Sequence, residues 1–131
     1  QGKLALVDIR TGQEIWSRKA SSLYSPMIGG GQIYLASANG DVVALRGSDR
    51  REAWSQDRLA WRQLTQPMVY GDYLVVGDFE GYLHWINRST GELAARSRVG
   101  RAPITTGIRV VNDVLFVQDD GGELAAVRLP Q

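Results

Sequence analysis

The sequence predicts an all-β fold, a partial β-propeller of about three and a quarter four-stranded blades. Landmarks recur with a period near 40 residues, since Gly40-Asp41-Val42, Gly81-Tyr82-Leu83 and Gly122-Glu123-Leu124 follow one another 41 residues apart. Between them lie short apolar runs bounded by Gly, Asn and Asp, and no stretch of 11 or more residues keeps helical spacing free of glycine. Runs such as Tyr73-Leu74-Val75-Val76 are apolar at consecutive positions, which is typical of strands covered on both faces.

Each repeat contains four short strands in order. From Pro26 onward, one unit shows an apolar stretch that ends at the turn 29–31, a run over 32–36, a run over 42–45 and a last run around Trp54. Over the whole chain this pattern predicts two strands, two complete blades and a final group of three strands, thirteen in total. We expect one domain, 1–131, with repeats over about 2–39, 40–80, 81–121 and 122–131.

The predicted ring is incomplete. A little over three blades is fewer than the 4 to 8 that closed propellers use. We therefore expect the chain to be the C-terminal arc of a longer protein whose N-terminal region supplies the missing outer strand. Open sheet edges at both ends predict self-association of the arc.

Composition excludes several classes of function. The 15 basic side chains are interleaved with 14 acidic ones, for a net charge of +1, which argues against nucleic acid as a partner. The chain has no cysteine, so it holds neither disulfides nor thiolate metal sites. No apolar run approaches the roughly 18 to 20 residues that a membrane-spanning helix needs.

No catalytic, cofactor-binding or metal-binding residues are predicted. His84 is the only histidine, lies on a predicted strand and has no neighbour in sequence that could share a metal or a proton, so we expect it to have a packing role. Asp78 and Glu80, in the turn before Gly81, are expected to be solvated turn acids rather than a glycosidase pair or a calcium loop. Asp119 aligns with Asp78 one repeat later.

Aromatic residues divide into core and candidate contact residues. Trp16 and Trp54 recur at one repeat position and are expected in the core. Trp61 stands in the irregular segment 57–64, outside the repeat, where an exposed aromatic beside arginine is typical of a protein-binding hot spot, although it could also fold over the blade edge. Propeller topology gathers the linkers between blades and the turns between second and third strands on one face. The candidate partner-binding residues on that face are Tyr24, Leu59, Trp61, Arg62 and Phe79.

Two motifs carry a family resemblance. The segment from Val7 to Trp16, with Asp8 at a strand end and Thr11-Gly12 in the turn, resembles the repeat of quinoprotein-type propellers, and the string from Tyr73 to Asn87 resembles the penultimate blade of the BamB family. This resemblance implies an eight-bladed propeller held by an N-terminal lipid, outside this segment, at the periplasmic face of the Gram-negative outer membrane.

The same resemblance implies a function. It would be a non-catalytic scaffold of the outer membrane β-barrel assembly complex without a cofactor, which binds the periplasmic domains of BamA and other subunits of the complex. Unfolded outer membrane proteins are further expected partners. The family's contact with BamA is assigned to inter-blade loops of earlier blades, upstream of this segment. The alternative is an arc of a quinone-cofactor dehydrogenase, which uses the same repeat.

Overall fold

The computed structural model describes residues 2–20, 26–37 and 40–128, without the side chains of residues 2–4, 6 and 15–20. All regular elements in this part are strands, thirteen in number, and no helix is present that could cross a membrane. Their bounds are β1 Gly2–Val7, β2 Glu14–Ala20, β3 Met27–Gly29, β4 Gln32–Ala36, β5 Val42–Arg46, β6 Glu52–Gln56, β7 Met68–Tyr70, β8 Tyr73–Gly77, β9 Tyr82–Asn87, β10 Leu93–Arg98, β11 Arg109–Val111, β12 Val114–Gln118 and β13 Leu124–Arg128.

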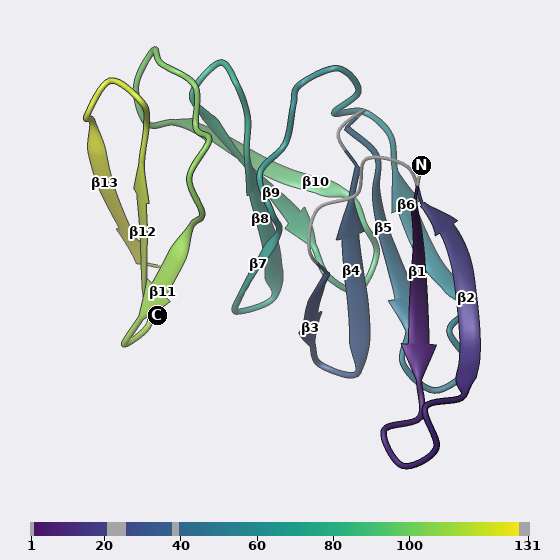
Figure 1. Cartoon of the computed structure of the whole chain (residues 1–131). Coiled ribbons are helices and arrows are strands. Elements are labelled where there is room, and N and C mark those ends of the chain that lie inside the picture. The colour runs from purple at the N-terminus through teal and green to yellow at the C-terminus, as the bar shows by residue number, and fades with distance from the viewer. Residues whose placement is uncertain (1, 21–25, 38–39, 129–131) are drawn as a thin grey trace.

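The strands form four antiparallel sheets in chain order, which lie side by side like the blades of a fan (Figure 1). We name them blade 1 (β1 and β2), blade 2 (β3 to β6), blade 3 (β7 to β10) and blade 4 (β11 to β13). The grouping of two, four, four and three strands confirms the arrangement predicted from the repeats. The partial propeller is therefore the observed fold.

Apolar side chains pack between the blades. Leu74 and Val76 of β8 point into a cluster shared with blade 2, whereas Val75, between them, points into a second cluster shared with blade 4, and all three are fully buried. Blade 3 is thus covered on both faces, which is why its second strand is apolar at consecutive positions. Each such side chain contributes roughly 1.5–3 kcal/mol by leaving water.

Trp54 joins blade 2 to blade 3, as predicted for a core aromatic. Its ring packs 6.2 Å from the ring of Tyr34, and its indole Nε1 donates a hydrogen bond of 2.7 Å to the carbonyl oxygen of Arg88. The position one repeat later is Ala95, which is exposed on β10. The side chain of Trp16 lies outside the described residues.

Loops collect at the two ends of the blades (Figure 1). At one end the linkers between blades meet the turns between second and third strands: the amide of Phe79 donates to the carbonyl of Arg62 at 3.1 Å, and that of Asp120 to Pro103 at 2.8 Å. We call this end the loop face, formed by residues 57–67, 78–81, 99–108 and 119–122. The opposite end holds short hairpin turns, where the amide of Gly47 donates to the carbonyl of Gly31.

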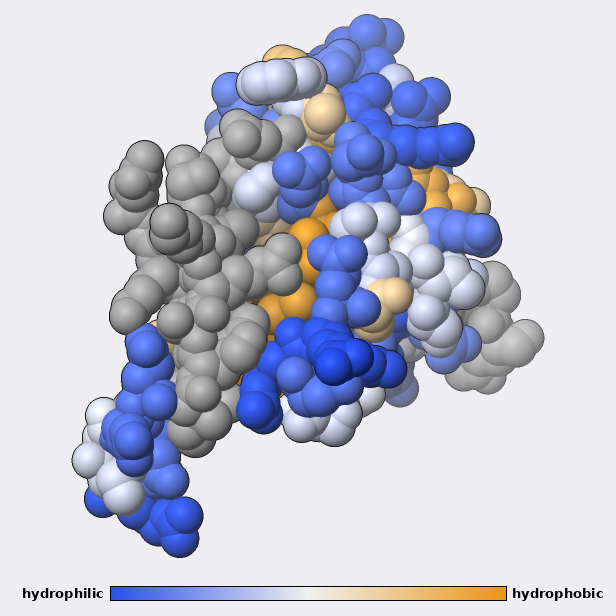
Figure 2. Space-filling model, turned by 90° about the vertical axis from the view of Figure 1, so that its right-hand side faces the viewer, coloured by the Kyte–Doolittle hydropathy of each residue, from blue (hydrophilic) through white to orange (hydrophobic). Residues whose placement is uncertain are grey.

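Figure 2 shows the side of the molecule next to β1, β2 and β6. In the coloured part of this view, charged and polar side chains cover most of the surface, and apolar side chains show in smaller areas, one of them near the middle.

Candidate protein-binding site

The loop before blade 3 has an unusual backbone conformation that sets the direction of Trp61. Trp61 and Gln63 both have left-handed backbones, with φ of +66° and +53°, on either side of Arg62. Such a conformation costs roughly 1–2 kcal/mol for each residue that has a Cβ atom. The loop keeps it because Leu59 and Leu64 are anchored in the core and the carbonyl of Arg62 accepts a hydrogen bond from Phe79.

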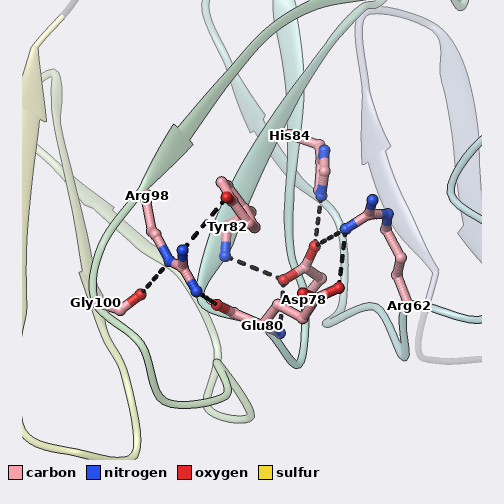
Figure 3. A network of polar contacts seen from close by, with 7 residues as sticks. All are labelled: Arg62, Asp78, Glu80, Tyr82, His84, Arg98 and Gly100. Atoms are coloured by element: carbon pink, nitrogen blue, oxygen red, sulfur yellow. Dashed lines mark hydrogen bonds and ion pairs between the residues drawn. The ribbon is translucent and has the colours of Figure 1, made fainter.

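Asp78, at the end of β8, is the centre of the polar network on the loop face (Figure 3). Its Oδ1 accepts hydrogen bonds from the backbone amides of Glu80 and Tyr82, at 2.8 and 3.0 Å. Its Oδ2 lies 3.1 Å from Nη1 of Arg62 and 2.6 Å from Nε2 of His84. This one carboxylate therefore joins the linker, the turn and strand β9.

Burial and hydrogen bonding act in opposite directions on the pKa of Asp78. Burial raises the pKa, whereas the hydrogen bonds from His84 and from the amides of Tyr82 and Glu80 lower it, and the electrostatic interaction with His84 lowers it further. The net pKa of Asp78 lies below its ordinary value of 3.8. Asp78 is therefore ionised at neutral pH, although its side chain has no contact with solvent.

Arg98, at the end of β10, holds the other side of the same turn (Figure 3). Its guanidinium donates to the carbonyl oxygens of Glu80 and Gly100, at 3.2 and 2.9 Å, and lies 4.7 Å from the centre of the Tyr82 ring. The turn of residues 78–81 is thus held between Arg62 of the preceding linker and Arg98 of β10. A turn held in this way presents its exposed side chains in one orientation.

Two of the five predicted contact residues present apolar surface on the loop face. Trp61 is 78% exposed and Phe79 is 40% exposed, and Phe79 lines a hollow of about 300 Å³ together with Leu64 and Ile104. Arg62 is partly exposed and directed at Asp78. Leu59 is only 2% exposed and anchors the loop in the core instead of facing a partner, and Tyr24 lies outside the described residues.

The expectation that the turn acids are solvated is wrong for Asp78 and holds for Glu80, which is half exposed. Asp119, the equivalent of Asp78 in blade 4, is also buried. Both carboxylates accept the amides of their own turns, which replaces the water they lose. The hairpin register offered a signal that Asp78 contacts His84. His84 pairs with Val76, and Asp78 lies two residues after Val76, so Asp78 and His84 share a face of the hairpin.

The network has the properties of a structural support. His84 is buried as expected for a packing residue, and its Nε2 is hydrogen-bonded to Asp78. Among the residues that the structure describes, no group of three or more His, Cys, Asp or Glu side chains could hold a metal ion. What the arrangement does is hold a strained loop and a turn so that Trp61 and Phe79 face solvent.

Comparison with known proteins gives consistent results. The family described as outer membrane protein assembly factor BamB matches residues 1–128. The curated protein of that name from Marinobacter adhaerens is 66% identical over 98% of this chain and 33% of its own length. The chain spans about a third of the length of the curated relatives it matches.

Solved structures agree on the fold. The crystal structure of BamB from Moraxella catarrhalis is 28% identical, with a TM-score of 0.86 over 98% of this chain and 38% of that one. A quinohemoprotein alcohol dehydrogenase from Pseudomonas putida matches 79% of this chain and 18% of its own, at a TM-score of 0.67 and 23% identity. At that identity the likeness to the dehydrogenase concerns the fold alone.

Proposed function

Since the chain belongs to the family of the outer membrane protein assembly factor BamB, we propose that it is a non-catalytic scaffold in the assembly of outer membrane proteins. It acts at the periplasmic face of the outer membrane, where it binds the periplasmic domains of BamA. The blades supply rigidity and the loop face supplies contacts. Trp61, Arg62 and Phe79 form the contact surface of this arc.

The observation that carries the proposal is an exposed tryptophan on a rigidly held loop. A large aromatic side chain in water contributes nothing to folding, whereas in a protein interface it is the kind of residue that dominates binding. The loop places Trp61 outward at the expense of two left-handed residues, and backbone strain of this kind concentrates at functional sites. Because the loop is already ordered, little conformational entropy is lost on binding.

The proposal is tested by binding of the protein to the periplasmic domains of BamA, measured by biolayer interferometry. We expect Trp61→Ala to weaken binding by roughly tenfold to thirtyfold, as for other aromatic hot spots, with an unchanged melting temperature. The matched control is Ile9→Ala, because Ile9 is 97% exposed on a hairpin at the opposite end of the blades. Equal affinities of Trp61→Ala and the unsubstituted protein would refute the assignment of the contact, and no binding by either would refute the partner.

A further inference from the structure

A recess lies between the linker that precedes blade 3 and the outer strand of that blade. It has a volume of about 350 Å³ and is lined by Arg58, Leu59, Arg62, His84 and residues 93–96 of β10. His84 and Leu59 are the most recessed of these groups, since the His84 side chain is only 4% exposed and Leu59 is 2% exposed. The recess is distinct from the apolar surface of Trp61 and Phe79, neither of which lines it.

Arginines dominate the charge of the recess. Arg58, Arg62 and Arg96 line it. Arg98 lies two residues after Arg96 on β10, and both guanidinium groups contact the ring of Tyr82. The nearby carboxylates that form ion pairs are Asp78 and Glu80, and both are paired with Arg62. In the described part of the chain, Arg58 and Arg96 pair with no carboxylate. Arg58 and Arg96 therefore bring positive charge to the recess that no ion pair in the described residues neutralises.

One of these arginines is held in position for a ligand. The guanidinium of Arg96 lies 4.6 Å from the centre of the Tyr82 ring, a stacking contact that leaves its N–H groups at the edge free to donate. The planar guanidinium matches a carboxylate with two parallel hydrogen bonds. The walls formed by Leu59, Leu93 and two alanines offer apolar surface to the methylene groups that carry such a carboxylate.

We propose that this recess binds a carboxylate side chain of an acidic polypeptide segment, held between Arg58 and Arg96. A phospholipid phosphate has the same charge but is fixed in the plane of a membrane. The recess lies between the linker and the outer strand of blade 3 and has its histidine almost fully buried, so it suits a side chain on a flexible chain better than a headgroup on a flat surface. This site does not depend on the scaffold role proposed above, because it can be measured without any partner protein.

The single histidine of the chain provides a direct test. The imidazole signals of a proton–carbon NMR spectrum come from His84 alone, and His84 lines the recess. We expect glutarate to shift these signals saturably, with a Kd on the order of millimolar, as befits two solvent-accessible charge pairs. Glutaramide, and sodium chloride at equal ionic strength, should leave the signals in place. No saturable shift with glutarate would overturn the proposal.

Substitutions identify the arginines. Arg96→Gln and, separately, Arg58→Gln should each weaken glutarate binding by about fivefold or more, since each removes a charged hydrogen-bond donor. Arg109→Gln on β11, away from the recess, is the matched control and should bind as the unsubstituted chain does. Two separate variants are used so that the assignment can still be tested if one of them fails to fold. Unchanged binding in both would overturn the assignment of the site.

The source of the carboxylate is tested with a capped peptide that carries two glutamates and with its glutamine counterpart. We expect the glutamate peptide to shift the His84 signals and the glutamine peptide to leave them unchanged. Vesicles containing phosphatidylglycerol form the competing arm. The proposal would be overturned if the vesicles bind the unsubstituted chain, fail to bind Arg96→Gln, and the glutamate peptide does not bind. The ligand would then be a lipid and not a polypeptide.

Discussion

Replacing Asp78 by asparagine removes the charge at the centre of the loop-face network and keeps the shape of the side chain. The amide oxygen can still accept the backbone amides of Glu80 and Tyr82, whereas its NH₂ group cannot accept from Arg62 and can form only a neutral hydrogen bond with Nε2 of His84. A hydrogen bond to a charged group contributes about 1.5–3 kcal/mol, and the one with His84 is buried. Arg62 is 28% exposed and can turn to water, so the loss of its ion pair with Asp78 adds no more than about 1 kcal/mol. We expect Asp78→Asn to lower the free energy of unfolding by about 1.5–4 kcal/mol.

The assay is urea unfolding followed by tryptophan fluorescence at a series of pH values. The pKa of Asp78 is lowered in the folded state, so its ionised form stabilises the protein fully above the unfolded value near 3.8. That stabilisation is lost as the pH falls through the lowered folded pKa. The difference between the protein and Asp78→Asn should therefore be constant from about pH 7 to about pH 5 and shrink below about pH 4.

Asp119→Asn is the matched control one blade later. The Oδ1 of Asp119 accepts the amides of Gly121 and Glu123, but its buried Oδ2 has no hydrogen-bond partner in the described residues. Removing this charge should change the free energy of unfolding by less than about 1 kcal/mol. Two results would refute the view that charge pairing at Asp78 holds the loop face. One is a loss of unfolding free energy in Asp78→Asn as small as that in Asp119→Asn, and the other is a loss that is the same at pH 3 and pH 7.

Two further substitutions and one control substitution probe the packing of the blades. Trp54→Phe keeps an aromatic ring but leaves the carbonyl of Arg88 without its donor, so we expect a loss of about 1–3 kcal/mol in urea unfolding, and a loss below about 0.5 kcal/mol would contradict this role. Gly40→Ala should cost more than about 2 kcal/mol, because Gly40 has a φ of +96° and an added Cβ would overlap the carbonyl oxygen of Leu59. Gly12→Ala, with a φ of +71° and open space around it, should cost only about 1 kcal/mol, and equal effects at both glycines would show that steric contact at Gly40 is unimportant.

The fold was predictable because the same local sequence signals recur in each repeat. A period of 41 residues, turns marked by glycine and strands apolar on both faces are local properties, and each recurs from blade to blade. The same repetition indicated which loops share an end of the molecule, and therefore that Trp61 and Phe79 lie on one face. Trp54 could be assigned to the core because aromatic residues at a fixed repeat position fill the space between blades.

The chemistry of the site was less predictable. Asp78 looks like any acid in a turn, and its burial depends on donors from Arg62, sixteen residues earlier, and His84, six residues later. Leu59 looks like a loop residue, and its burial depends on the cluster between blades 2 and 3. Neither environment is a property of the local sequence, because each requires groups that are close only after the hairpins and linkers have packed.

The sequence by itself determined the number and order of the strands, their grouping into blades and the end of the blades at which each loop emerges. These features follow from local periodicity and turn residues, which act over a few residues and are repeated along the chain. Only the tertiary structure decided which acids are buried and ionised, which loop residue is anchored and which is exposed, and where unpaired arginines meet to form a recess. Burial and charge pairing depend on the sum of neighbours in space, and in this protein those neighbours come from successive blades.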